Sequence, residues 1–224
     1  MASPTIVFDL DGTLIDTAPD LIDTLNVVFA REGLPAVDYA TARNLIGGGA
    51  RAMIVRGVEA EGLVVPPEEI ERMFADFIAH YSAHIADRSR PFPGLIDVLD
   101  ELEARGCRLA VCTNKLERLS QLLLDELKLT KRFAFICGQD TFGIPKPDPE
   151  VLRRTIKAAG GSPQHAVMIG DSVTDIRTAR AAGIPVIAVA FGYSETPVSE
   201  LGPDRVISHF AELPASIAAL SFAQ

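Results

Sequence analysis

The chain has 224 residues, of which 48% are hydrophobic and 23% are charged. This ordinary globular composition excludes a disordered chain, a collagen-like chain and a disulfide scaffold. The net charge is −9 and no run of lysine or arginine exceeds two residues, so we expect no nucleic-acid partner. The apolar runs are far shorter than the ~20 residues of a membrane span. No basic, apolar leader precedes the first strand, so we expect a cytoplasmic protein with no membrane partner.

The N-terminal part of the chain predicts one strand followed by helices alone. The sequence TIVFD over 5–9 has the pattern of a buried strand. The spacing of apolar residues then predicts helices over 19–31, from 50 to about 60, and over 70–85. Three consecutive glycines at 47–49 separate the first of these helices from the second.

From residue 93 the pattern changes to an alternation of helices and short apolar strands. Helices are predicted over 95–104, 116–126, 149–159, 173–182 and 210–220. Strands are predicted over 108–112, 134–137, 166–169, 186–189 and 205–208. This alternation indicates an α/β fold, a Rossmann-like doubly wound parallel sheet with helices on both faces. We expect residues 1–15 and 89–224 to form this core, and residues 16–88 to form a small α-helical cap domain inserted after the first strand.

Acids, hydroxyls and lysines follow the predicted strands, where a parallel sheet places its reactive groups. The segments are Asp9-Leu10-Asp11-Gly12-Thr13, Thr113-Asn114-Lys115, Lys146-Pro147-Asp148 and Gly170-Asp171-Ser172-Val173-Thr174-Asp175. Each segment alone has an ordinary explanation as a turn, a helix cap or a helix-entry loop. Four such segments at one edge of a sheet indicate a single site.

In this order and spacing, the four segments resemble the haloacid dehalogenase superfamily of phosphotransferases. The resemblance covers the whole chain, because the helical insertion is similar to the small helical cap of that family. It implies that Asp9 is the nucleophile and forms an aspartyl-phosphate. It also implies that Asp11 protonates the leaving oxygen and later activates the hydrolytic water.

The resemblance implies roles for four further residues around the phosphoryl group. Gly12 would turn the backbone so that amides face the phosphate oxygens. Thr113 and Asn114 would donate hydrogen bonds to the same oxygens. Lys146 would neutralise negative charge on the phosphoryl group and on the nucleophile.

A Mg²⁺ cofactor is also implied, because two carboxylates this close together repel each other without a cation. Its ligands would be Asp9, Asp171 and the backbone carbonyl of Asp11, since Mg²⁺ prefers oxygen ligands. Asp175 would orient Lys146 or a metal-bound water; the alternative is a place on a solvated helix face or a pairing within its helix.

Finer features resemble the phosphoglycolate phosphatase family, whose members convert 2-phosphoglycolate to glycolate and phosphate. These features are the segment RPFPG over 90–94, TNK over 113–115, GDS over 170–172 and FGY over 191–193. Leu116 departs from the family's pattern, which has a proline there. The cap would select the substrate. Its glycines Gly48 and Gly49 would present amides to a substrate carboxylate, and Arg51 would pair with that carboxylate. Alternatively, these glycines only make a tight turn and Arg51 is solvated.

Other functions on the same scaffold stay open. The second aspartate, Asp11, favours phosphoryl chemistry over dehalogenation, and the absence of lysine from residues 16–89 argues against a phosphonoacetaldehyde hydrolase. A phosphatase for another small phosphate ester or pyrophosphate, and a phosphosugar mutase similar to β-phosphoglucomutase, are the alternatives. A non-catalytic binding protein is disfavoured by the complete set of acids and lysine. The sequence leaves the oligomeric state open.

Overall fold

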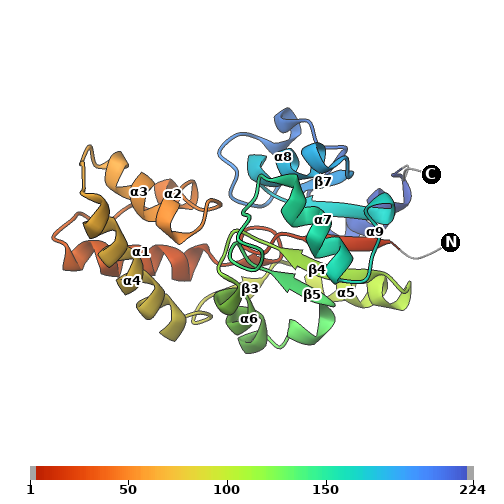
Figure 1. Ribbon diagram of the computed structural model, residues 1–224, viewed down its shortest axis with the longest axis horizontal. Coiled ribbons are helices and arrows are strands. Elements are labelled where there is room, and N and C mark those ends of the chain that lie inside the picture. The colour runs from red at the N-terminus through yellow and green to blue at the C-terminus, as the bar shows by residue number, and fades with distance from the viewer. Residues whose placement is uncertain (1–3, 221–224) are drawn as a thin grey trace.

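The computed structural model describes residues 4–220 and shows a six-stranded sheet between two layers of helices, with a separate group of helices at one end (Figure 1). The strands are β1 (Thr5–Phe8), β4 (Arg108–Cys112), β5 (Phe135–Cys137), β6 (Ala166–Gly170), β7 (Val186–Val189) and β8 (Arg205–Ile207). All neighbours are parallel, in the order β5-β4-β1-β6-β7-β8. The chain therefore builds one half of the sheet outward from β1 and then crosses over to build the other half from β6. The predicted doubly wound sheet is confirmed.

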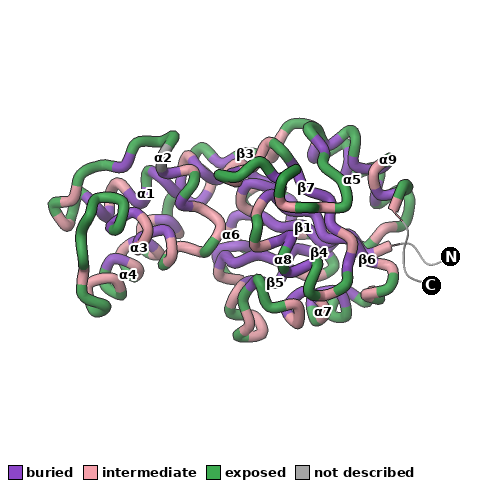
Figure 2. The backbone as a smooth tube through the Cα atoms, turned by 90° about the horizontal axis from the view of Figure 1, so that it is seen from above, coloured by how far each residue is buried: buried purple, intermediate pink, exposed green. Residues whose placement is uncertain are grey.

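Alternate residues of each strand face the two helical layers, as the pleat of a strand requires. Ile6 and Phe8 belong to one hydrophobic cluster, whereas Val7 belongs to the other. The first cluster includes side chains of α5 (Leu95–Ala104), α6 (Glu117–Glu126) and α9 (Leu213–Ala218). The second includes side chains of α7 (Pro149–Ala158) and α8 (Val173–Ala182). The strands are buried in the middle of the molecule (Figure 2).

The group of helices between β1 and β4 consists of α1 (Ala18–Arg31), α2 (Tyr39–Arg43), α3 (Ala50–Ala60) and α4 (Pro67–Ala83). Helix α4 packs against both α1 and α3. A Cβ atom at Gly57 would lie 2.8 Å from the ring of Phe29, so this glycine allows α3 to approach α1 closely. The sequence did not predict α2, because five residues are too few for a helical spacing of apolar positions to be visible.

A two-stranded antiparallel ribbon connects these helices to the sheet. Its strands are β2 (Ile15–Asp16) and β3 (Arg90–Pro91). Beside it, the buried carboxylate of Asp20 accepts hydrogen bonds from the amide of Ser89 at 2.7 Å and from its hydroxyl at 2.6 Å. We propose that the boundary between core and cap lies at this ribbon. Residues 1–3 and 221–224 of the expected core lie outside the described residues.

The predicted element boundaries differ from the observed ones mainly at helix ends. Helix α4 begins three residues before the predicted start at residue 70. The last predicted helix is divided into a 3-10 turn and α9. The 3-10 turns lie at Thr130–Arg132, Pro163–His165, Val198–Leu201 and Phe210–Glu212. Within residues 4–220, no helix combines the length and the apolar character that a bilayer crossing requires.

Candidate active site

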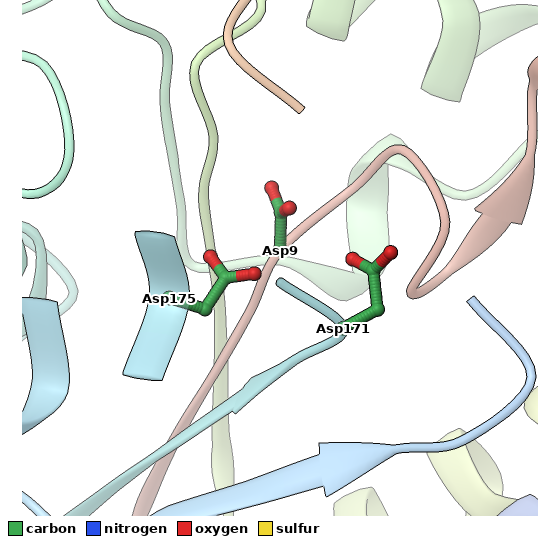
Figure 3. A group of neighbouring side chains, drawn as sticks. All are labelled: Asp9, Asp171 and Asp175. Atoms are coloured by element: carbon green, nitrogen blue, oxygen red, sulfur yellow. The ribbon is translucent and has the colours of Figure 1, made fainter. Parts of the chain in front are cut away.

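Three buried carboxylates meet at the carboxyl ends of β1 and β6. Asp9 follows β1, Asp171 follows β6, and Asp175 lies in the first turn of α8. Because β1 and β6 are neighbouring parallel strands in register, the residues that follow them are side by side. In Figure 3 the carboxylate of Asp9 stands between those of Asp175 and Asp171. One oxygen from each carboxylate lies within 4.8 Å of the others.

Lys146 supplies a cation to this cluster from the loop before α7. Its Nζ lies 2.9 Å from Oδ1 of Asp9 and 2.5 Å from Oδ1 of Asp175. Burial alone would lower the pKa of Lys146, but Asp175 and Asp9 raise it above its ordinary value, so the ammonium stays charged. The side chain of Asn114 holds the backbone of Lys146, accepting from its amide at 2.9 Å and donating to its carbonyl at 3.2 Å. Asn114 thus positions Lys146, and it also lines the cavity, so its expected role toward the phosphate oxygens stays a prediction.

Asp175 uses both carboxylate oxygens within the protein. One oxygen contacts Lys146, and the other accepts from the amide of Ser172 at 3.1 Å and from its hydroxyl at 2.6 Å. These bonds complete a capping box at the start of α8. Asp175 is fully buried, so the alternative of a solvated helix face does not hold.

Asp171 is fixed by loops that follow β1 and β7. Its Oδ1 accepts from the hydroxyl of Thr13 at 3.0 Å, and its Oδ2 accepts from the amide of Tyr193 at 2.8 Å. Gly12 has φ +84°, and a Cβ atom there would lie 2.5 Å from Oδ2 of Asp171. The amide of Gly12 donates to the carbonyl of Ile15, so this glycine admits the Asp171 carboxylate instead of offering its own amide to a phosphate.

Tyr193 also contacts the connecting ribbon. Its hydroxyl accepts from the amides of Thr17 and Ala18, at 2.7 Å and 3.0 Å, and donates to Oδ1 of Asp16 at 2.6 Å. From α2, the guanidinium of Arg43 lies 5.0 Å from the centre of the Tyr193 ring. One side chain of the core therefore holds the start of the helical insertion.

The acidic cluster carries more negative charge than one lysine neutralises. Burial, with Asp175 adding to it, raises the pKa of Asp9 to about 7 although Lys146 opposes the shift. Burial and the charges of Asp175 and Asp9 raise the pKa of Asp171 to about 8. A hard divalent cation would relieve this repulsion, and carboxylate oxygens are the ligands that such a cation prefers. The donor set therefore fits a divalent metal.

A cavity of about 40 Å³ lies between this cluster and the helical insertion. Asp9, Asp11, Thr113 and Lys115 line it on the core side. The opposite wall is formed by apolar and aromatic side chains and by glycine backbone, from residues Leu21, Ile46, Gly47, Gly49, Ala50, Met53, Phe74, Phe77, Ile78 and Tyr81. The insertion thus covers the ends of the strands, as a cap does.

Lys115 is a lining residue to which the sequence analysis gave no role. Its Nζ lies 2.9 Å and 3.1 Å from the two carboxylate oxygens of Asp11, and the hydroxyl of Thr17 donates to the same carboxylate at 2.8 Å. The Nζ also lies 4.5 Å from the centre of the Tyr81 ring on α4. The only sequence signal was the place of Lys115 in the TNK segment, two residues after Thr113.

Only some residues of the glycine turn before α3 line the cavity. Gly49 lines the cavity and lies against the core, since a Cβ atom there would be 3.0 Å from the carbonyl oxygen of Asn114. Gly48 and Arg51 are not among the cavity-lining residues of the described chain. The Nε and Nη2 atoms of Arg51 bind the carboxylate of Glu71 on α4, at 2.8 Å and 2.6 Å. This pairing differs from the expectation that Arg51 faces a substrate, because its position on α3 directs it toward α4.

The fold and the acidic site together define a class of hydrolase. The sequence profile of the haloacid dehalogenase-like hydrolases matches residues 6–189, so the chain belongs to this family and is an enzyme. The resemblance inferred from the four segments is confirmed.

Relatives of this chain carry more specific names. It is 50% identical over 218 residues to a phosphoglycolate phosphatase of Mesorhizobium japonicum, covering 97% of this chain and 96% of that protein. It is 35% identical to an N-acetylmuramic acid 6-phosphate phosphatase of Pseudomonas aeruginosa, covering 95% and 94% of the two chains. The crystal structure of a predicted phosphoglycolate phosphatase of Haemophilus somnus superposes with a TM-score of 0.88 at 27% identity, covering 95% and 97%.

Proposed function

We propose that this enzyme is a Mg²⁺-dependent phosphatase that hydrolyses 2-phosphoglycolate to glycolate and phosphate. The observation that carries the proposal is the lining of the cavity above Asp9, where Asp11, Thr113 and Lys115 lie beside the nucleophile and helices of the insertion cover them, which suits a small anionic phosphate ester. The relatives named phosphoglycolate phosphatase support the same substrate.

The reaction follows from the residues that line the cavity. A carboxylate oxygen of Asp9 attacks phosphorus and forms an aspartyl-phosphate, while Asp11 gives a proton to the departing oxygen of glycolate. Asp11 then takes a proton from water, which attacks the phosphorus and frees both phosphate and Asp9. Lys146, 2.9 Å from Asp9, offsets the negative charge that gathers there in both steps. Thr113 lines the cavity next to these groups and supplies a hydroxyl for the phosphate oxygens.

Mg²⁺ is the proposed cofactor, held by Asp9, Asp171 and the backbone carbonyl of Asp11. When bound, it would supply positive charge that offsets the negative charge of the nucleophile and of the phosphoryl group. Asp175 does not need to be a ligand, because both of its oxygens are already engaged with Lys146 and Ser172.

Two alternative substrates are less well supported. N-acetylmuramic acid 6-phosphate, named for one relative, would have to place its polar sugar ring against the apolar and aromatic side chains of the insertion that line the cavity. A phosphosugar mutase must hold a second phosphate and needs cations on its cap. Within the described chain, no cap arginine lines the cavity. Arg51 and Arg72 pair instead with glutamates outside it, each at 2.6 Å.

The proposal is tested by kcat/KM for a panel of phosphate esters with Mg²⁺ and with EDTA. The panel contains 2-phosphoglycolate, glucose phosphates, pyrophosphate, N-acetylmuramic acid 6-phosphate and an aryl phosphate. We expect 2-phosphoglycolate to be preferred by about two orders of magnitude, which corresponds to ~2.7 kcal/mol in the transition state. A flat profile would reject this substrate and retain the phosphatase chemistry.

A further inference from the structure

One basic side chain, that of Lys115, lines the cavity among the described residues. Among the described lining residues of the cavity, Lys115 is the only lysine or arginine; Lys146 contacts Asp9 at 2.9 Å but is not part of the lining. The side chain of Lys115 is only 5% exposed. A substrate with a second negative group, besides its phosphoryl group, would find its positive partner here.

A free hydrogen-bond donor lies beside this lysine. Tyr81 is 1% exposed and lines the cavity, and its hydroxyl is buried without a hydrogen-bond partner in the described structure. Such a group is costly to bury unless something pairs with it. Burial and the nearby charges of Asp11 and Asp20 raise the pKa of Tyr81 well above its ordinary value, so the hydroxyl keeps its proton and can donate it to an acceptor.

The position of Lys115 relative to Asp11 matches the chemistry of 2-phosphoglycolate. In this molecule a single CH2 group separates the ester oxygen from the carboxylate carbon. The group that protonates the ester oxygen and the group that binds the carboxylate must therefore be neighbours in the enzyme. Asp11 and Lys115 are in contact at 2.9 Å.

We propose that the ammonium of Lys115 and the hydroxyl of Tyr81 form the site that binds the carboxylate of the substrate. This inference rests on the proposed function and assigns its specificity to a core lysine and a cap tyrosine. In the empty site Lys115 pairs with Asp11. When the carboxylate arrives, Lys115 pairs with it instead, and Asp11 is released from that ion pair to act on the leaving oxygen.

The experiment compares two substrates on the same enzyme samples: 2-phosphoglycolate and its neutral carboxamide analogue. The ratio of their kcat/KM values does not depend on the fraction of folded enzyme, so a partly folded variant still gives a valid result. The variants are Lys115→Met, which keeps the length of the side chain without its charge, and Tyr81→Phe, which removes only the hydroxyl. Arg51→Ala is the matched control, because it removes a cap cation that lies outside the cavity.

A charge-assisted hydrogen bond contributes substantially to the binding free energy. We therefore expect Lys115→Met to lower the ratio of kcat/KM for 2-phosphoglycolate to kcat/KM for its carboxamide by about tenfold or more. Tyr81→Phe should lower it by about threefold or more, and Arg51→Ala should leave it unchanged. If Lys115→Met lowers kcat/KM equally for both substrates, Lys115 acts only on Asp11 and the inference is wrong. The proposed function would still stand in that case. If the wild-type enzyme does not prefer 2-phosphoglycolate to its carboxamide, the proposed substrate and the inference fail together.

Discussion

Raising the pH should destabilise the metal-free enzyme, and Mg²⁺ should remove that effect. The pKa values of Asp9 and Asp171 are about 7 and about 8 in the folded protein, against 3.8 for the unfolded side chain. Both groups bind protons more tightly when the protein is folded. Their contribution to stability is therefore fully present below about pH 4 and is lost as the pH rises through 7 to 8.

The size of the effect follows from the two shifts. A shift of one unit corresponds to ~1.4 kcal/mol, so the charged pair would cost several kcal/mol at pH 8.5 in the absence of a cation. Relaxation and water entry reduce this cost. Even ~2 kcal/mol would lower the Tm of a chain of this length by ~4–8 °C.

The assay is thermal unfolding at pH 5.5, 7.0 and 8.5, with EDTA and with excess Mg²⁺. The increase in Tm on adding Mg²⁺ should grow with pH, because protons and the metal compete for the same carboxylates. Groups remote from the cluster, such as His80, contribute equally with and without Mg²⁺ and cancel in this difference. Asp171→Asn should weaken the pH dependence of the increase. An increase in Tm that is the same at pH 5.5 and pH 8.5 would refute the reasoning.

Three further changes test other parts of the structure. Asp9→Asn should abolish turnover while the circular dichroism spectrum stays native. Its Tm in EDTA at pH 8.5 should rise, because a buried charge is removed. Turnover at the wild-type rate in a folded variant would contradict the role of Asp9 as the nucleophile. Arg43→Ala should raise KM for 2-phosphoglycolate severalfold with little change in Tm, because it removes a contact between α2 and the Tyr193 ring; an unchanged KM would show that this contact does not help to close the cap. Gly57→Val should lower the free energy of unfolding by about 1–3 kcal/mol in urea titrations, because its Cβ meets the Phe29 ring; an unchanged midpoint would show that the helices can separate without cost.

The core of the site could be predicted from the sequence because its signal is local. Asp9 and Asp171 each follow an apolar strand, and the ends of neighbouring parallel strands must meet. Lys146 lies in a loop before a helix, and the family resemblance brought it to the site. Its contact with Asp175 depends on where the loop before α7 and the first turn of α8 lie at the edge of the sheet.

The cap side could not be predicted in the same way. Helical spacing marks Tyr81 as a buried position on its helix, but a buried position facing a cavity looks the same in the sequence as one facing a helix. The direction of Arg51 depends on Glu71, which is twenty residues away on another helix. The role of Lys115 depends on how closely the cap approaches the core, and no local pattern records that distance.

The ribbon of β2 and β3 is the connection between the helical insertion and the sheet. Because its two strands lie side by side, the chain leaves the sheet and returns to it at nearly the same point. The whole helical unit can therefore be exchanged or enlarged during evolution without altering the order of the strands. Lys115 would stay with the core in such an exchange, whereas the apolar wall that limits substrate size would leave with the helices. The cation that we propose for the substrate carboxylate and the apolar wall opposite it are thus inherited on different parts of the chain.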